Sequence, residues 1–493
     1  MKNQSGLFDQ SKLRYGLSQS ESGFLGLSRS IPIRNWTLEL TDDLPLHRIV
    51  AQGIGDVGYL VGYAYDPRSG ELIEGDLVLS EGESRSWVID QSVEWSGVFL
   101  LIILHQNDIE VRLDPGGQLP LFFRSEVPRL AGSISELASP SEIDARLNKA
   151  LHADYVASRG NGGWIPGTLT AVDGIRRLLP NHGLLLSSLE ATRFWPTELK
   201  LHHDMNIEHV AKSIAIELRS FIHALAANKI VSSGLTAGED SRSILCASRD
   251  VLSNVQFFTV DFPQSRLDNY AATELAKRWA LKHKTIDFIA STPEEEREWD
   301  RLVGYSVVEA GRSSVNCLAQ LEQGAWIMDG AFGEIGRCFY YGGKEETINE
   351  KTLTVAALMA SMGIPDNAAV RADLDHWLSS TDHLCTSVRL DLAYLELRVA
   401  SWAMGQKPGG RGVARQISPF AQRRIFEMFM ASPPSAKKGS QLFRKIYQGL
   451  WPEVAMFPVN QYGDYRDILR LAKKISDIPR VIRFVRKKLA LAR

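Results

Sequence analysis

The chain has 493 residues and a formal net charge of −2. This length exceeds what one hydrophobic core usually spans, so we expect two domains. The charge balance gives no basic field that would recruit nucleic acid, so no nucleic-acid partner is expected. The four cysteines show no paired spacing, which argues against a zinc site or a disulfide framework and favours the reducing cytoplasm.

The first two hundred residues are predicted to form a packed sheet domain. Short runs rich in β-branched and aromatic residues occur at 59–65, 77–79, 98–104, 110–113 and 121–124, and turn residues separate them. A helix is expected over residues 142–158. Closely spaced strands of this kind favour antiparallel pairing.

The second half of the chain alternates between helical and strand patterns. A helix with one apolar stripe is expected over residues 206–227. Strands are then expected at 229–235, 255–261, 284–288 and 325–329, with helices opening at 240, 269 and 293 between them, and the chain after 353 is mostly helical. This alternation predicts a parallel sheet with helices on both faces.

Small and hydroxylated residues directly follow the first strand of this alternating region. The stretch reads Thr236-Ala237-Gly238-Glu239-Asp240-Ser241-Arg242. Small side chains let backbone N–H groups approach an anion, and the start of a helix adds partial positive charge. The stretch contains no lysine and lacks the Walker spacing. We therefore predict a phosphate-binding loop of another kind; the alternative is an ordinary turn capped by Asp240.

A second glycine-containing loop follows the strand expected at 325–329. It reads D-G-A-F-G-E-I-G-R over residues 329–337. An acidic group in this loop is suited to Mg²⁺, and Arg337 to neutralising a leaving pyrophosphate. Either Glu334 or Asp329 could be that acid. The alternative is a surface turn with one exposed ion pair.

These loops resemble motifs of the asparagine synthetase family. The first is similar to its PP-loop, S-G-G-x-D-S, with Thr236 replacing Ser and Ala237 replacing the first Gly; the second is similar to G-x-G-x-D-E-L-F-G-G-Y, with Glu334 aligned to the Glu. Other resemblances follow in the family's order: D-P-G-G-Q-L-P-L-F at 114–122, L-P-N-H at 179–182, S-P-F at 418–420 and L-W-P-E at 450–453.

The resemblance implies an α+β domain joined to an α/β domain. The first is a glutaminase-like, Ntn-type β-sandwich over residues 1–200; the second is a PP-loop ATP-binding parallel-sheet domain over 201–465, followed by a basic helical tail over 466–493. It implies ATP and Mg²⁺ as ligands, with Glu334 and Arg337 in catalysis and Asp240 and Glu334 at Mg²⁺. The residues implied at ATP and its pyrophosphate are Thr236, Ala237, Gly238, Asp240, Ser241, Arg242, Gly330 and Gly333.

The sequence departs from this family at two catalytic positions. Lys2 stands where glutamine-dependent members carry the nucleophilic cysteine, and the first cysteine of the chain is Cys246, so no glutaminase activity is expected. Residues 456–460 lack the family's late lysine, which stabilises charge during acyl-adenylate chemistry. Lys437, Lys438 and Lys445 are the candidates to replace it.

The predicted function is amide bond formation by adenylation of a carboxylate, with release of AMP and pyrophosphate. Ammonia or another amine is the acceptor, and glutamine is not the donor. The substrate is a small-molecule or peptide carboxylate, and a homodimer is compatible with the sequence. The alternative is a catalytically degenerate homologue that binds nucleotide and regulates or scaffolds a partner. A tRNA-modifying PP-loop enzyme would need a basic surface or catalytic cysteines, and the sequence shows neither.

The tail over residues 466–493 carries ten Lys or Arg residues against Asp467 and Asp477. Apolar residues at helical spacing accompany them, which predicts contact with an anionic membrane surface or an acidic partner. The alternative is a solvated terminal helix that packs one apolar stripe.

Deleting residues 480–493 tests the membrane interpretation of the tail. The deletion removes six of the ten basic residues (480, 483, 486, 487, 488 and 493), so co-sedimentation with anionic vesicles is expected to fall. The measurement compares the bound fraction of the full chain with that of the deletion variant. An unchanged bound fraction would end the membrane interpretation.

Overall fold

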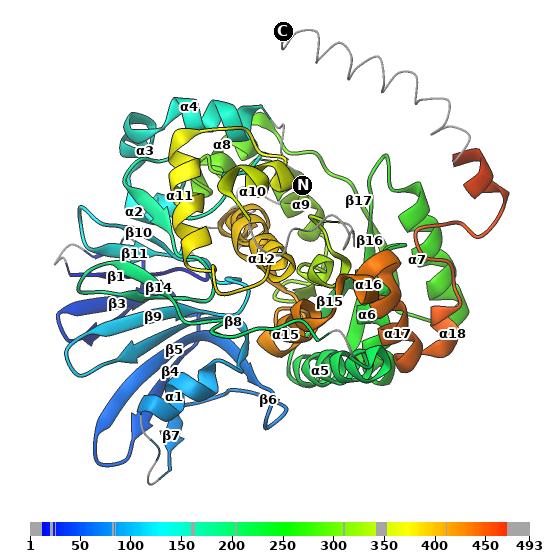
Figure 1. Cartoon of the computed structure of the whole chain (residues 1–493), viewed down its shortest axis with the longest axis horizontal. Coiled ribbons are helices and arrows are strands. Elements are labelled where there is room, and N and C mark those ends of the chain that lie inside the picture. The colour runs from blue at the N-terminus through cyan, green and yellow to red at the C-terminus, as the bar shows by residue number, and fades with distance from the viewer. Residues whose placement is uncertain are drawn as a thin grey trace.

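The computed structural model describes most of the chain. The described residues are 12–19, 23–24, 26–80, 83, 85–158, 163–202, 205–308, 311–341, 353–410 and 412–470. Lys2 and residues 471–493 of the predicted tail lie outside them. Figure 1 shows the sheets of the first two hundred residues on one side of the molecule and the later strands with their helices on the other.

Two sheets of the first half pack face to face. The first sheet has the strand order β12-β10-β11-β1-β3-β2, and the second β14-β13-β9-β8-β5-β4-β7, with β6 beside β5. The strands are β1 (Tyr15–Ser18), β2 (Arg29–Ile33), β3 (Trp36–Leu40), β4 (Leu46–Ala51), β5 (Gly55–Asp66), β6 (Glu71–Leu72), β7 (Leu77–Leu79), β8 (Ser96–Leu104), β9 (Ile109–Leu113), β10 (Phe122–Arg124), β11 (Arg129–Ala131), β12 (Ile175–Arg177), β13 (His182–Leu185) and β14 (Glu190–Arg193). One apolar core takes side chains from both sheets, among them Leu38 and Leu100.

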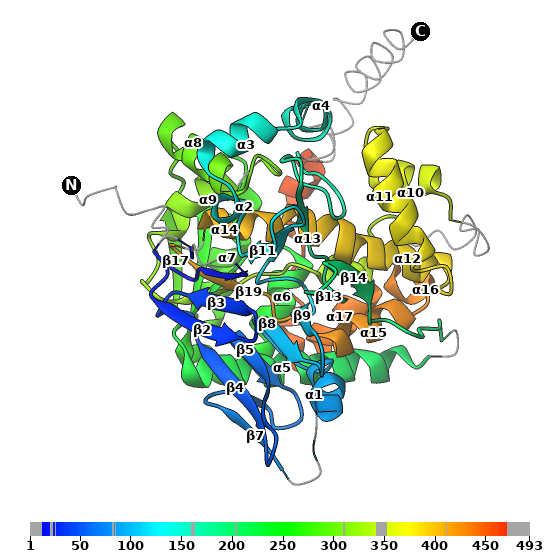
Figure 2. The ribbon, with the colours of Figure 1, turned by 90° about the vertical axis from the view of Figure 1, so that its left-hand side faces the viewer.

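The burial of each strand follows from what covers its two faces. Strand β3 alternates between buried and half-buried residues, as expected where only one face meets the core. Strand β8 is buried along almost its whole length, because α1 (Arg85–Ser92) covers the outer face of its sheet through Val88. Figure 2 views the molecule from the side of these strands.

The third sheet is entirely parallel. Its strand order is β17-β16-β15-β18-β19, with β15 (Val231–Gly234), β16 (Val255–Asp261), β17 (His283–Asp287), β18 (Trp326–Met328) and β19 (Arg415–Ile417). The chain adds strands on one side of β15 first and then returns to add β18 and β19 on the other side. The order therefore reverses between β15 and β18, which is where open α/β sheets bind ligands.

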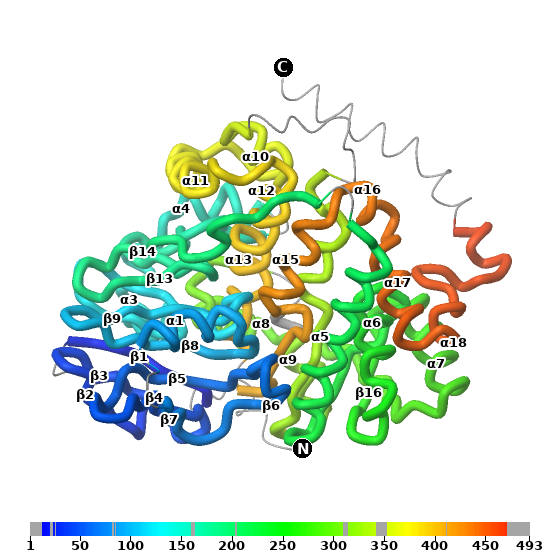
Figure 3. The backbone as a smooth tube through the Cα atoms, turned by 60° about the horizontal axis from the view of Figure 1, so that its bottom comes forward, coloured from blue at the N-terminus to red at the C-terminus, as the bar shows by residue number. Residues whose placement is uncertain are grey.

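Helices surround this sheet. The longest, α5 (Ile207–Asn228), buries a stripe that includes Ile214 and Leu218 and is capped by Asn206. It lies beside α17, which also contacts α6 (Figure 3). The other helices are α2 (Ile134–Leu137), α3 (Pro140–Arg146), α4 (Lys149–Leu151), α6 (Glu239–Ala247), α7 (Arg266–Trp279), α8 (Pro293–Leu302), α9 (Gly311–Leu318), α10 (Val355–Met362), α11 (Ala368–Ser379), α12 (Thr386–Ala393), α13 (Ala400–Trp402), α14 (Lys407–Gly410), α15 (Arg423–Ala431), α16 (Pro434–Lys437), α17 (Gln441–Leu450) and α18 (Pro452–Ala455).

Two expected helices are shorter in the structure. The helix expected over 142–158 is interrupted after Arg146, because Leu147 pairs with Val172 and Asn148 begins a new helical turn. The helix opening at 293, expected to extend to about residue 309, ends at Leu302, and Gly304 two residues later has a positive φ. Among the described residues, we find no helix with the length and apolarity needed to cross a membrane.

The two halves of the chain are joined by buried hydrogen bonds between segments far apart in sequence. Gln118 accepts a hydrogen bond from the Ser418 N–H at 2.7 Å. The Arg423 Nε donates to the Asn181 side chain at 3.0 Å. The S-P-F segment therefore lies against the turn at 114–122, and Arg423 at the start of α15 lies against the L-P-N-H segment.

A buried ion pair ties β14 to the helical part of the second half. The two terminal nitrogens of the Arg193 guanidinium, Nη1 and Nη2, donate to the Glu396 carboxylate at 2.7 Å. Trp377 Nε1 and Asn181 Nδ2 donate to the same carboxylate. Glu396 is fully buried and Arg193 is 6% exposed. Because the pair is buried and its carboxylate accepts from four donors, removing one partner should strongly lower the free energy of unfolding.

We expect Glu396→Ala to lower the free energy of unfolding by about 3–5 kcal/mol, because Arg193 is left buried without its carboxylate. Denaturant unfolding measures the change. The matched control is the double variant Arg193→Met with Glu396→Leu, which removes both charges and should lose less than the single variant. A double variant that loses more would contradict the role given to the unpaired charge.

Candidate functional site

A cleft opens at the carboxyl ends of the central parallel strands. Its volume is about 500 Å³, within the usual range for small-molecule sites. The cleft is lined by Gly234 at the end of β15 and by residues that follow the strands: Thr236 after β15, Phe262 after β16 and Asp329 after β18. It therefore lies at the point where the strand order reverses. Both loops singled out in the sequence border this cleft.

The first loop leads directly from β15 into α6. Thr236, Gly238, Asp240 and Ser241 line the cleft. The Thr236 and Ser241 hydroxyls are 2.9 Å apart, and the Gly238 N–H donates to the Thr236 hydroxyl. Gly238 is the N-cap of α6 and has no side chain that could accept from the first-turn N–H groups. These groups are therefore suited to an anion from outside the loop.

One loop N–H is held by a residue that the sequence did not single out. The Ala237 N–H donates to the carboxylate of Asp268, at the start of α7, at 2.9 Å. The Ala237 carbonyl accepts from the Asn460 N–H at 2.8 Å. Asp268 and Asn460 thus fix the backbone of the loop from both sides. Asp268 belongs to no motif that would have predicted this contact, whereas Asn460 ends the stretch 456–460 where the resemblance expects the late lysine.

The second loop meets the first through an ion pair. Arg337 lies in the 3₁₀ helix Gly333–Arg337, and its guanidinium contacts the carboxylates of Asp240 at 2.7 Å and Glu334 at 2.8 Å. The loop backbone also packs against Asp240: a Cβ added at Gly330 would lie 2.5 Å from the Asp240 Cβ, and one added at Gly333 would lie 2.1 Å from its Oδ1. Only glycine allows this approach.

The surroundings of Asp240 shift the pKa of its carboxyl group. Burial raises its pKa to about 6 from its ordinary value of 3.8, against the opposing effect of Arg337. Its Oδ1 is buried and has no hydrogen-bond partner among the described residues, although Oδ2 is paired. An acceptor held in this way is suited to a cation or a donor from a ligand.

The structure distinguishes the two candidate acids of the second loop. Asp329 lines the cleft, whereas Glu334 does not and contacts the site through Arg337. Asp329 Oδ1 accepts from the Ala331 N–H, and its Oδ2 lies 3.7 Å from the Nζ of Lys407. Lys407 was not predicted from the sequence, because the K-P-G-G stretch that contains it matches no functional motif.

Three predicted site residues lie away from the cleft. Arg242 is buried and donates to the carbonyls of Val454, Phe457 and Pro458, so its guanidinium holds the chain segment after α18 rather than facing the loop. Lys437 is fully buried in an ion pair with Asp391. Lys438 is exposed. None of the three lines the cleft.

The far side of the cleft is apolar. Its wall is formed by aromatic and aliphatic side chains, namely Phe258, Val260, Phe262, Trp299, Val315, Leu318, Trp402 and Val413. Over the described part of the chain, no group of three or more His, Cys, Asp or Glu side chains is arranged to hold a metal. Mg²⁺ commonly uses only one or two carboxylates together with phosphate oxygens and water, which Asp240 and its unpaired Oδ1 fit.

The raised pKa of Asp240 predicts a pH-dependent stability. The folded protein binds the proton of the Asp240 carboxyl group more tightly than the unfolded chain does. Protonation of Asp240 therefore adds to the free energy of unfolding below about pH 4, and this added stability is lost as the pH rises through about 6. Between about pH 4 and pH 7, the free energy of unfolding of the wild-type chain is expected to fall by about 1–3 kcal/mol more than that of Asp240→Asn. Denaturant unfolding at pH 4, 5, 6 and 7 measures the difference.

The control for this prediction is Asp366→Asn, whose side chain is 70% exposed. It should leave the pH profile of stability almost unchanged. A difference between wild type and Asp240→Asn that is constant from pH 4 to 7, or that changes with the opposite sign, contradicts the prediction.

Comparisons with known proteins do not identify a family. No protein-family model and no curated protein matches the chain. A glutamine phosphoribosylpyrophosphate amidotransferase from B. subtilis has 12% identity and a TM-score of 0.19, covering 68% of this chain and 73% of its own. An allosteric regulatory enzyme of purine biosynthesis has 11% identity and a TM-score of 0.22, covering 66% and 70%. Similarity at these scores is too low to indicate a shared fold or function, and the PP-loop assignment stays a prediction.

Proposed function

We propose that the protein is an ATP-dependent amide ligase that activates a carboxylate as its acyl adenylate. The observation that carries the proposal is the meeting of two glycine-containing loops, joined by Asp240 and Arg337, on a cleft where the strand order reverses. Sheets of this kind bind nucleotides at this point. The two loops are also the stretches with the strongest resemblance to the asparagine synthetase family.

The polar side of the cleft suits the phosphates of ATP. The uncapped start of α6 offers N–H groups and partial positive charge. Thr236 and Ser241 add hydroxyl donors. Mg²⁺ bound by Asp240 would neutralise charge on the pyrophosphate. The Arg337 guanidinium, held between Asp240 and Glu334, would stabilise the negative charge that develops as pyrophosphate leaves.

The apolar side of the cleft suits an adenine ring or the body of the acid. Phe258 and Val260 come from the strand next to the loop, and Trp402 comes from the helical segment that faces it. In the proposed reaction, a carboxylate oxygen of the substrate attacks the α-phosphorus of ATP and pyrophosphate leaves. The amine nitrogen then attacks the acyl carbon, loses a proton, and AMP leaves.

A second candidate function rests on the absence of a lysine where the resemblance requires one. The end of the stretch 456–460 does lie beside the loop, since the Asn460 N–H donates to the Ala237 carbonyl, but the stretch contains no lysine. Lys437 is engaged with Asp391. These observations favour a protein that binds nucleotide without turnover and regulates or scaffolds a partner.

An assay of AMP and pyrophosphate release separates the two functions. The purified chain is incubated with Mg-ATP, hydroxylamine and a pool of small acids extracted from the source cells. We expect AMP release that requires the pool and falls at least about a hundredfold in Asp240→Ala, because that change removes both the proposed metal ligand and the partner of Arg337. Asp366→Ala, at an exposed position, is the matched control.

Two outcomes would contradict the ligase proposal. Release of ADP in place of AMP would exclude adenylation as the chemistry. ATP binding that depends on Asp240, with no AMP from the pool or from added peptides that carry carboxylates, would favour the regulatory candidate.

A further inference from the structure

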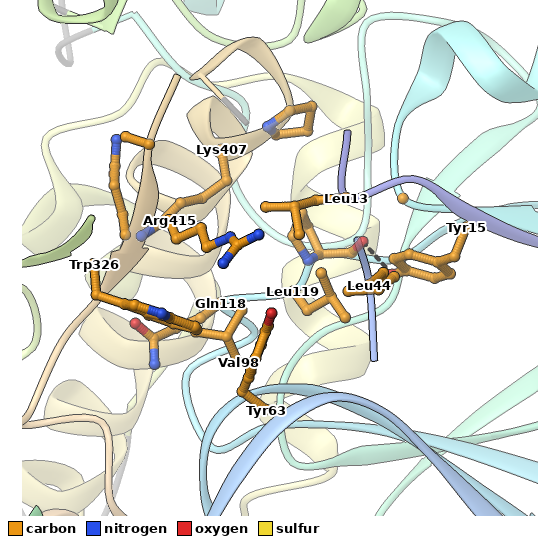
Figure 4. Close-up of a pocket in the computed structure, with 15 residues that line it drawn as sticks. Leu13, Tyr15, Leu44, Tyr63, Val98, Gln118, Leu119, Trp326, Lys407 and Arg415 are labelled. Carbon is orange, nitrogen blue, oxygen red and sulfur yellow. Dashed lines mark hydrogen bonds between the residues drawn. The ribbon is translucent and has the colours of Figure 1, made fainter. Parts of the chain in front are cut away.

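A second, smaller pocket lies between the two halves of the chain, apart from the cleft. Its volume is about 50 Å³. Leu13, Tyr15, Tyr63 and Gln118 line it from the first half, and Trp326, Lys407 and Arg415 line it from the second (Figure 4). The proposed function assigns no role to this pocket, which we call the junction pocket.

Hydrogen-bond donors in the junction pocket lack acceptors. The Nζ of Lys407 and the Nε1 of Trp326 are both buried, and neither has a hydrogen-bond partner among the described residues. Lys407 is 11% exposed and Trp326 is 2% exposed. Buried donors of this kind cost free energy unless a partner is supplied. Two such donors lining the same pocket indicate a ligand that accepts hydrogen bonds.

Two polar side chains of the junction pocket are already engaged within the protein. The Gln118 side-chain oxygen accepts from the Ser418 N–H, and its amide group donates to the Gly97 carbonyl. The Tyr15 hydroxyl donates to the Pro120 carbonyl at 2.6 Å. The Gln118 amide is therefore occupied, whereas the donors of Lys407 and Trp326 have no acceptor among the described residues.

The charged side chains that line the pocket are both cations. Arg415 is 29% exposed, and its nearest carboxylate, Asp43, lies 4.0 Å away. Lys407 lies 3.7 Å from Asp329. Both distances exceed a hydrogen bond, and neither carboxylate lines the pocket. Burial lowers the pKa of Lys407, with Asp329 and Asp114 opposing the shift, so a further anion near its Nζ would favour the protonated amine.

We propose that the junction pocket binds a small carboxylate anion, held by Lys407, Arg415 and the Trp326 N–H. A water needs roughly 10–15 Å³ of such space, so the pocket has room for about three to five atoms of that size. Acetate and propionate match this size. The apolar walls, which include Leu13 and Leu119, suit the short alkyl group. The proposal does not depend on catalysis in the cleft, because it concerns binding alone.

Saturation-transfer NMR on the full chain with acetate as the probe tests this site, with acetamide as its neutral isostere. We expect saturable binding of acetate and at least tenfold weaker binding of acetamide. Lys407→Met and Arg415→Met keep apolar stems and should each weaken acetate binding at least tenfold. Lys277→Met, at an exposed position on α7, is the matched control and should leave it unchanged.

The wild-type comparison of acetate with acetamide stands by itself if a pocket variant fails to fold. Equal binding of the two probes would overturn the assignment of an anion. Acetate binding that survives both pocket substitutions would place the anion elsewhere and also overturn the proposal, as would the absence of saturable acetate binding.

Discussion

The contact between Asp240 and Arg337 is the interaction on which the arrangement of the cleft depends. It joins the loop after β15 to the loop after β18, across the position where the strand order reverses. The contact needs glycine at 330 and 333, since any side chain there would overlap Asp240. Burial of Asp240 raises its pKa to about 6, so the pair carries an electrostatic cost in the folded protein. Groups with such costs are often found where chemistry or ligand binding requires them.

The first half of the chain forms part of the support for this region. Gln118 is hydrogen-bonded to the chain just after β19, and Arg423 to Asn181. The buried pair between Arg193 and Glu396 adds a third link. The packed sheets of the first half therefore have a structural role, because their removal would expose these polar groups and the apolar surface around them.

The same junction creates the donor-rich pocket beside the cleft. Lys407 is shared between them: it lines the pocket, and its Nζ approaches Asp329, which lines the cleft. An anion bound in the pocket would compete with Asp329 for this lysine. Such an anion would therefore change the charge next to the cleft, through Lys407.

The sequence alone predicted the helices and strands whose apolar residues recur with a clear helical or strand period. The alternation of strands and helices after residue 206 predicted four of the five parallel strands, and β16 has the predicted bounds. The glycine-containing loops and their acids were visible because small residues after a strand restrict what the backbone can do. The tertiary structure alone revealed β19, which is only three residues long. It also turned Arg242 and Lys437 away from the cleft and brought Asp268 and Lys407 to its loops. Local patterns record which face of an element is apolar, but the partner of a charged side chain is set by chain segments that come together only in the fold.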